Sequence, residues 1–291
     1  MTTPRPRRLP LVRVLPTADA VAEAAATGIV TSLAAAITER GVAHWSTTGG
    51  STAPGIYRRL RVPPLRDLVD WSRVHVWWGD DRFVPADDPL SNVLPLEELL
   101  LAAESGEAAD GDGEAAGGGE SAGAGAAAGG DLGGVRIPAA NLHPVPVAEA
   151  IAVGQGAAGA ASAYETTLLL EGPGRNVDGV PVFDVVILGV GPDGHVLSVF
   201  PGSAAWDVGA LVLAVPAPTH VEPHVERVTM HPDVVAAART VLVVSAGASK
   251  AAVLGRAWRG DDAREVPVRM TMATNATWIL DEAAAAELPR E

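Results

Sequence analysis

The stretch FDVVILGVGPDGHVLSVFPG, residues 183–202, indicates the fold more strongly than any other part of this 291-residue chain. Its first half is an apolar run of strand length, which is typical of a strand buried on both faces of a parallel sheet. Gly189, Gly191 and Gly194 then form a G-x-G-x-x-G pattern directly after this run. The stretch therefore predicts a buried strand followed by a turn whose backbone can approach a ligand closely.

The glycine pattern alone does not predict a dinucleotide site. A dinucleotide fingerprint needs its third glycine inside a substantial helix, with an acidic residue about twenty positions later. Here Pro201 follows so soon that any helix from His195 must be short, and the motif lies in mid-chain. Two interpretations stay open. Asp193 and His195 are an acid and a base that face a cleft, or they are a solvated aspartate and a capping histidine in a tight turn.

The rest of the chain alternates between expected strands and helices. Strands are predicted over residues 42–46, 74–78, 240–245 and 276–281, and helices over 18–38, 49–60, 155–171, 249–258 and a short alanine-rich stretch after 281. Such alternation is typical of βαβ units. We therefore predict an α/β fold with a Rossmann-like open, mainly parallel sheet and helices on both faces, formed as a single domain over residues 1–291. Ligands bind such sheets beyond the carboxyl ends of the strands.

Composition limits the possible functions. The chain is 48% hydrophobic and has no cysteine, which excludes disulfides and thiolate catalysis and fits a cytoplasmic protein. Its formal net charge of −14 argues against binding to nucleic acid or to a membrane surface. We find no signal peptide, and we expect no apolar run near the length that spans a bilayer. An anionic ligand would need basic side chains gathered locally.

Residues 104–134 differ from the rest of the chain. They contain seven acidic residues, no basic residue and a single leucine as their largest apolar side chain. Such a segment cannot offset the entropy of ordering, so we predict a disordered surface insertion within the domain. A functional acidic segment is the alternative, and the sequence does not identify what it would bind.

Two loops beyond predicted strands carry candidate anion ligands. In STTGGSTAPGIYRRL, 46–60, the hydroxyls and backbone N–H groups of Gly49, Gly50, Ser51 and Thr52 precede a helix, as in anion sites at helix N-termini. A plain helix N-cap is the alternative. In WWGDDRFVPADDPLSN, 77–92, a pair of aspartates adjoins Arg82, whose guanidinium suits bidentate contact with phosphate. A surface ion pair would give the same pattern.

Two further basic residues and a histidine pair complete the candidates. Arg227 precedes a threonine in HVERVTMHP, 224–232, and Lys250 lies in the first turn of a predicted helix. A cation at that position opposes the helix macrodipole, and a bound anion would remove this cost. His220 and His224 have a spacing seen in metal sites, but Pro223 separates them and no third ligand is evident, so we expect no metal.

Taken together, these loops resemble the 6-phosphogluconolactonase family, within the wider glucosamine-6-phosphate isomerase/6-phosphogluconolactonase superfamily. The matching stretches follow the family's order over roughly residues 44–288: TTGGSTAPGIYRRL, VWWGDDRFVPADDPLSN, FDVVILGVGPDGHVLSVFPG, ERVTM followed by VVSAGASKAAVL, and ATWILDEAAAAEL. The resemblance implies hydrolysis of 6-phospho-D-glucono-1,5-lactone to 6-phosphogluconate in the oxidative pentose phosphate pathway, with no cofactor and no metal. The partner implied is a small sugar phosphate, and the protein is expected to be a monomer or a homodimer.

The resemblance also implies roles for single residues. His195 matches the general base that activates water, and Arg82, Arg227 and Lys250 match basic positions near the substrate and its phosphate. Asp193 orients the imidazole or binds a substrate hydroxyl, and Asp80 is a further catalytic candidate. The sequence leaves the division of roles between these two aspartates open.

The chain departs mildly from the family pattern. The family usually has Asp-Glu-Arg where this chain has Asp80-Asp81-Arg82, which shortens one carboxylate and leaves its effect on rate open. A glucosamine-6-phosphate deaminase is the first alternative, but such proteins typically have Asn-Glu-Pro where this chain has Val199-Phe200-Pro201. A non-catalytic sugar-phosphate sensor is the second, and it would be expected to lose His195.

Overall fold

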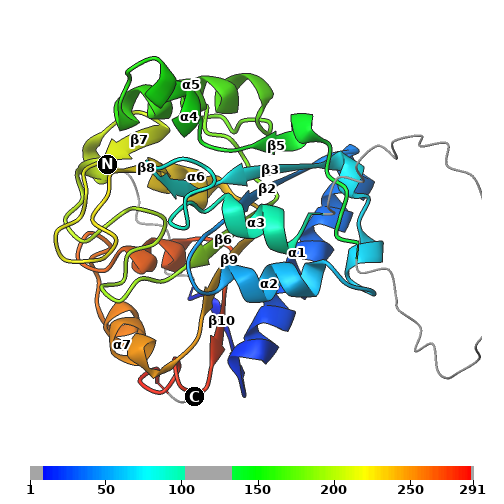
Figure 1. Cartoon of the computed structure of the whole chain (residues 1–291). Coiled ribbons are helices and arrows are strands. Elements are labelled where there is room, and N and C mark those ends of the chain that lie inside the picture. Colours follow the sequence, from blue (N-terminus) through cyan, green and yellow to red (C-terminus); the bar gives the residue numbers. More distant parts are fainter. Residues whose placement is uncertain (1–8, 102–132, 290–291) are drawn as a thin grey trace, which may run out of the picture.

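The computed structural model describes residues 9–101 and 133–289, so the segment predicted at 104–134 lies outside the described residues apart from its last two. Within the described residues, seven parallel strands form one sheet in the order β1-β10-β9-β6-β2-β3-β5 (Figure 1). These strands are β1 (Leu11–Leu15), β2 (Ala43–Thr47), β3 (Val74–Trp78), β5 (Leu142–His143), β6 (Val185–Gly189), β9 (Val241–Ser245) and β10 (Ala276–Asp281).

The central strands are buried on both faces because their side chains alternate between two apolar cores. On β6, Val186 and Leu188 lie in one core, and Val185 and Ile187 lie in the other. All four side chains are almost completely excluded from solvent. Each such burial contributes about 1.5–3 kcal/mol, so a strand of this composition is stable only inside a sheet covered on both sides.

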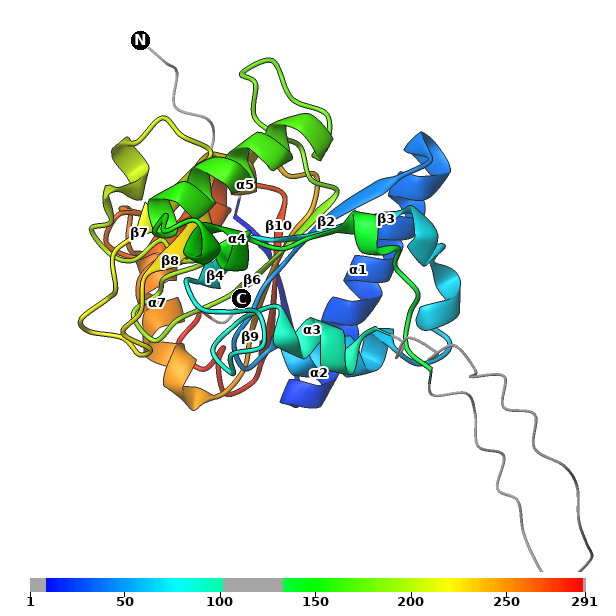
Figure 2. The same ribbon diagram turned by 45° about the horizontal axis from the view of Figure 1, so that its top comes forward.

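Helix α1 (Ala18–Arg40) covers one face, together with α2 (Ala53–Leu60) and α3 (Leu94–Leu99) (Figure 2). The Thr17 hydroxyl accepts a hydrogen bond from the first turn of α1, and Gly41 ends the helix in the left-handed conformation at φ 79°. By length and composition alone, α1 is long and apolar enough to cross a bilayer, which the sequence analysis did not anticipate. Half of its apolar window is buried inside the protein, against the large sheet and α2.

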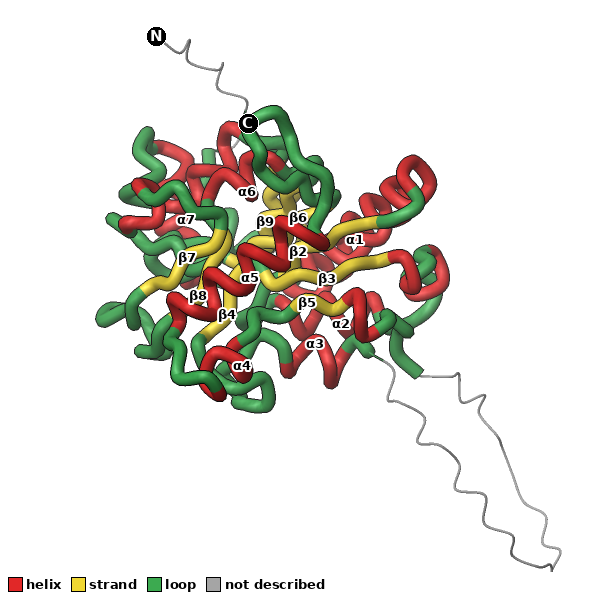
Figure 3. Tube along the Cα trace, turned by 90° about the horizontal axis from the view of Figure 1, so that it is seen from above, coloured by secondary structure: helices red, strands yellow, loops and turns green. Residues whose placement is uncertain are grey.

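The opposite face is covered by four helices and a second sheet (Figures 2 and 3). The helices are α4 (Val147–Ala152), α5 (Ala157–Glu171), α6 (Pro232–Ala237) and α7 (Ala251–Arg259). The second sheet is antiparallel in the order β4-β8-β7, with β4 (Asp80–Arg82), β8 (Arg227–Met230) and β7 (Val212–Val215). It carries two of the predicted anion-binding arginines, one on β4 and one on β8.

The predicted α/β fold, with a mainly parallel sheet and helices on both faces, is confirmed. The antiparallel sheet was not expected, because its strands are too short to show an alternating pattern. The prediction of an alanine-rich helix after β10 is wrong, because residues 282–287 form turns and residue 288 a bend. In this segment the Asp281 carboxylate accepts the Ala284 N–H and the Asp281 carbonyl accepts the Ala285 N–H, so the chain makes turns, and Pro289 has no N–H with which to continue a helix.

The order of the strands places a crevice at the centre of the sheet. From β2 the chain proceeds outward through β3 to β5, and from β6 it proceeds in the other direction through β9 to β10. The loops after β2 and β6, which are neighbours in the sheet, therefore diverge onto different sides. In open α/β sheets, this switch point is where ligands bind.

A cluster of three histidines lies in the same sheet, on β2, β3 and β5. The rings of His44 and His75 stack with centroids 4.8 Å apart, and His75 Nδ1 lies 3.0 Å from His143 Nε2. The indole of Trp77 stacks on His143 at 3.9 Å. Burial lowers the pKa of His44 to about 3 and that of His143 to about 4, and it also lowers the pKa of His75. The Glu171 carboxylate, 3.6 Å from His143, is mostly exposed.

This cluster predicts a loss of stability in mild acid. The unfolded chain takes up protons at the ordinary histidine pKa of 6.5, whereas the folded cluster resists them until lower pH. Stability is therefore complete above pH 6.5 and falls between pH 6.5 and about 4, by up to about 1.4 kcal/mol per pH unit for each neutral histidine. Urea unfolding at about pH 7.5 and about pH 5 measures this loss. His143→Gln should reduce the loss, and an undiminished loss in this variant would contradict the assignment.

Candidate active site

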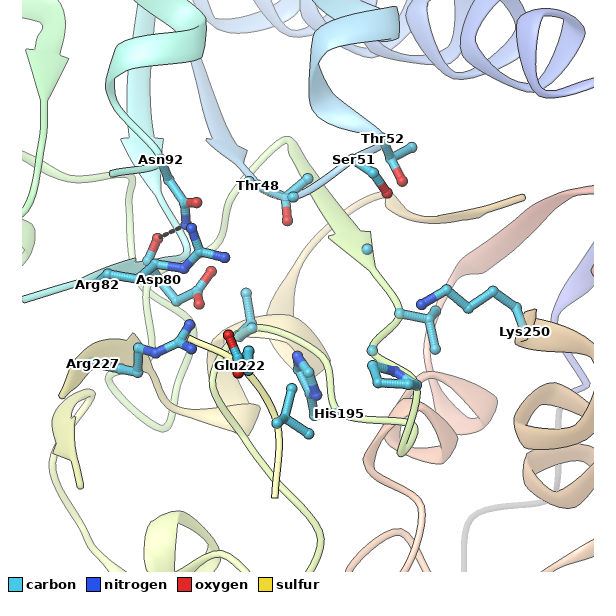
Figure 4. Close-up of a pocket in the computed structure, with 18 residues that line it drawn as sticks. Thr48, Ser51, Thr52, Asp80, Arg82, Asn92, His195, Glu222, Arg227 and Lys250 are labelled. Atoms are coloured by element: carbon cyan, nitrogen blue, oxygen red, sulfur yellow. Dashed lines mark hydrogen bonds between the residues drawn. The ribbon is translucent and has the colours of Figure 1, made fainter. Parts of the chain in front are cut away.

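The predicted site residues come together at the switch point. A cavity of about 330 Å³ lies beyond the carboxyl ends of β2 and β6 (Figure 4). All of the predicted phosphate-binding residues line it, together with His195 and Asp80. Asp193 does not line it and instead contacts His195 through its carboxylate. Segments that are more than 150 residues apart in the sequence thus form one pocket, with hydroxyls, cations and an imidazole in its walls.

The loop after β2 reaches the pocket because two glycines let it turn. A side chain on Gly49 would collide with the Asn92 amide, whose Oδ1 lies 1.7 Å from the position of a Cβ, and Gly50 has φ +75°. The hydroxyl of Thr52 precedes α2 but makes no capping hydrogen bond. The plain N-cap interpretation is therefore wrong for Thr52. Its hydroxyl lies in the pocket wall with that of Ser51 (Figure 4).

Arg82 and Arg227 place two positive charges side by side. They are direct partners in the register of β4 and β8. Arg82 donates to the carbonyl of Leu90 at 2.5 Å, and Arg227 donates to the carbonyls of Pro223 and Val225 at 2.8 and 3.2 Å. Burial, followed by repulsion from Arg82, lowers the pKa of Arg227. Like charges held together at one wall favour a bound anion.

The surface ion-pair interpretation of the DDR sequence is wrong. In the described part of the chain, no ion pair joins Arg82 to either aspartate. Asp80 is buried and accepts the Ser198 hydroxyl at 2.6 Å. Asp81 is buried as well, and it accepts the backbone N–H groups of Arg82 and Asn92, each at 2.8 Å.

Asp81 organises the loop and does not face the pocket. Burial raises the pKa of its carboxyl to about 7, against the hydrogen bonds from Asn92 and Arg82. Asn92 in turn donates its side-chain amide to the Asp80 carbonyl at 2.9 Å and fills the space beside Gly49. Asp81, which stands where the family usually has the longer Glu, therefore holds residues that line the cavity but does not line the cavity itself.

The loop after β6 forms an acid–base pair. His195 Nδ1 lies 2.5 Å from Asp193 Oδ1, which also accepts the backbone N–H of His195 at 3.1 Å. Burial alone would raise the pKa of Asp193, but the hydrogen bonds and charge of His195 outweigh burial and hold it well below its usual range. The ionised carboxylate orients the imidazole with Nδ1–H toward it, which leaves Nε2 available as a base. The ring fits because Gly191 has no Cβ, which would lie 2.1 Å from Nδ1.

Lys250 lies on the other side of the pocket from the two arginines (Figure 4). It precedes α7, and burial lowers its pKa while the charge of Asp193 raises it. No hydrogen bond or ion pair of its ammonium group is found within residues 9–101 and 133–289. The desolvation cost of this cation therefore outweighs its attraction to Asp193, which is the arrangement expected of a group that binds an anion.

Some lining residues have no clear signal in the sequence. Asn92 lies in a stretch singled out for its arginine, Leu197 lies in the stretch singled out for its glycines and His195, and Glu222 lies in a segment with no motif of its own. Leu197 adopts φ 54°, a left-handed conformation rare for a residue with a side chain, and packs against Gly79. His220 and His224 do not face a common point: His220 contacts Asp193, and His224 contacts the carbonyl of Pro218. Among the described residues, no group of three or more potential ligands could hold a metal ion.

Comparison with known proteins gives the same family as the loops. Residues 16–113 and 124–280 match the family described as glucosamine-6-phosphate isomerases/6-phosphogluconolactonase. The chain belongs to this family. A 6-phosphogluconolactonase of Streptomyces coelicolor is 31% identical over 94% of this chain and 92% of its own length. One of Mycobacterium tuberculosis is 31% identical over 96% of this chain and 98% of its own length.

A solved structure of a family member agrees in fold as well as in sequence. The 6-phosphogluconolactonase of Trypanosoma cruzi has a TM-score of 0.78 and 26% sequence identity, and the likeness covers 99% of this chain and all of that one. The family likeness thus extends over both sheets and over every loop that lines the pocket. The pocket described above is therefore the candidate active site of this family member.

Because the His195 ring packs directly against Gly191, a methyl group added at position 191 should displace the ring. Gly191→Ala should force the imidazole from its position, because the new Cβ would overlap the ring. Gly209→Ala is the matched control, since a Cβ there meets nothing within 4 Å. The ¹³C resonance of His195 Cε1 should move in the first variant and stay in place in the second. An unmoved resonance in a folded Gly191→Ala protein would contradict the packing described here.

Proposed function

We propose that this protein hydrolyses 6-phospho-D-glucono-1,5-lactone to 6-phosphogluconate, with His195 as the general base. The observation that carries the proposal is the His195–Asp193 pair, which adjoins a pocket lined by three basic side chains. The relatives named 6-phosphogluconolactonase cover nearly the whole chain and support the same activity. The substrate carries a phosphate and an activated ester, which require the anion site and the base respectively.

In the first step, His195 Nε2 takes a proton from a water molecule as its oxygen attacks the lactone carbonyl carbon. Asp193 holds the imidazole in the Nδ1–H tautomer and stabilises the imidazolium that forms. The carbonyl oxygen becomes a tetrahedral oxyanion. Backbone N–H groups of the glycine turns and the cations of the pocket are the donors that stabilise it.

In the second step, the oxyanion collapses and the bond between the carbonyl carbon and the ring oxygen breaks. The imidazolium of His195 returns its proton to that ring oxygen, which becomes the hydroxyl of the open-chain product. The carboxylic acid then loses a proton to water. Asp80 is held by Ser198 and is therefore proposed to bind a substrate hydroxyl, while Asp193 orients the base.

The cations provide substrate affinity in this proposal. Arg82, Arg227 and Lys250, with the hydroxyls of Ser51 and Thr52, bind the phosphate and the neighbouring oxygens. A δ-lactone is already an activated ester, so we propose that water activation by an imidazole suffices and that no metal takes part. A cytoplasmic location and a monomeric or homodimeric state stay predictions from the sequence.

His195→Ala tests the base. We expect kcat/KM for 6-phosphogluconolactone, generated in situ and corrected for spontaneous hydrolysis, to fall by at least about 10²-fold. His224→Ala is the matched control, because its ring lies outside the acid–base pair. An equally active, folded His195→Ala protein would place the base elsewhere. Turnover of glucosamine 6-phosphate by the wild type, without lactone hydrolysis, would favour the deaminase alternative.

Lys250→Met tests whether this cation binds the substrate or stabilises the fold. Removing a half-buried cation without a protein partner should leave the thermal stability unchanged or raise it, since the desolvation cost disappears. KM should rise by about tenfold, because one charge-assisted contact to the substrate is lost. Differential scanning calorimetry and steady-state kinetics measure the two effects. A large loss of stability with unchanged KM would indicate a structural lysine instead.

A further inference from the structure

A second histidine is bound to the same carboxylate as the candidate base. His220 Nε2 lies 2.9 Å from Asp193 Oδ2, while His195 occupies the other oxygen, Oδ1, at 2.5 Å. The phenyl ring of Phe200 contacts both imidazoles, with its centroid 4.7 Å from that of His195 and 5.7 Å from that of His220. The order His220, Asp193, His195 therefore leads from the protein surface to the pocket.

His220 belongs to the connection between β7 and β8, residues 216–226. Val221 and Glu222 of this connection line the pocket. Its far end is attached to Arg227, which donates to the carbonyls of Pro223 and Val225. His220 thus joins this connection to the loop of the candidate base, through its contact with Asp193 and its ring contact with Phe200.

We propose that His220 is a positioning residue for lactone hydrolysis, acting on His195 through the shared carboxylate of Asp193. This inference rests on the proposed function. By donating Nε2–H to Oδ2, His220 fixes the plane of the carboxylate and with it the orientation of the His195 ring. The side chain of His220 is about half exposed, so it exchanges protons with solvent, whereas the side chain of His195 is only 19% exposed.

The shared carboxylate also couples the charges of the two rings. One carboxylate can neutralise one imidazolium, so a proton on His220 disfavours a second proton on His195. The other charged groups that face this array are Lys250, whose charge interacts with Asp193, and the Glu222 carboxylate on the pocket wall.

Two substitutions separate hydrogen bonding from charge. Gln places an amide N–H close to the position of a histidine Nε2, so His220→Gln retains a donor to Asp193 but cannot become charged. His220→Ala loses both properties. His224→Gln is the matched control, because His224 lies in the same connection, is equally exposed, and bonds to a backbone carbonyl away from Asp193. The pH dependence of kcat and kcat/KM is measured for wild type and all three variants.

The expected results distinguish the proposal from a purely structural role. At the pH optimum, His220→Ala should lose about tenfold in kcat with little change in KM, and His220→Gln should recover most of it. In both, the acid limb of kcat/KM should lie at higher pH than in the wild type, by up to about one pH unit, while His224→Gln keeps the wild-type limb. Wild-type kcat and an unshifted limb in both His220 variants would overturn the proposal. An inactive wild type would overturn the proposed function instead.

Discussion

The structure depends on the divergence of the chain at the centre of its parallel sheet. Since β2 and β6 are neighbours whose following loops turn to opposite sides, no helix can cover the space beyond their carboxyl ends. Two glycines then allow the loops to fill that space closely, with Asn92 against Gly49 and the His195 ring against Gly191. The candidate base and the anion site therefore meet at this crevice, whereas helices cover both faces of the sheet.

The electrostatics of the pocket oppose those of the chain as a whole. The protein carries a formal net charge of −14, yet two arginines and a lysine converge on a small cavity. Arg82 and Arg227 both donate to backbone carbonyls, which hold their geometry without cancelling their charge. Lys250 is not satisfied in this way. The clustered cations therefore lower the stability of the free protein, and a doubly charged anion that binds them removes this cost. A loss of stability in favour of binding is common at functional sites.

Much of the fold could be predicted from sequence, because its dominant signals are local. The strands at 183–190 and 74–78 can be predicted from the sequence because each is a run of mostly apolar residues. The antiparallel sheet could not be predicted: β4 has three residues, and its pairing with β8 spans more than a hundred positions. Among the site residues, Ser51, Thr52 and His195 could be predicted because they lie next to glycines in turns that follow predicted strands. Asn92 and His220 were not, because their importance arises from contacts with Asp80 and Asp193 that no local pattern encodes.

The pairing of β4 with β8 has a consequence for how this chain can change over time. Arg82 and Arg227 share the pocket wall because they are opposite each other in one antiparallel register. A one-residue insertion or deletion inside either strand would turn one guanidinium to the other face of the ribbon, so both cations depend on the length of two short segments. Length changes in the connections outside these two strands leave the register unchanged, because they do not alter which residues of β4 and β8 face each other. An insertion is thus expected to disrupt the anion site when it falls inside β4 or β8, and to leave the site intact when it falls in a connection outside them.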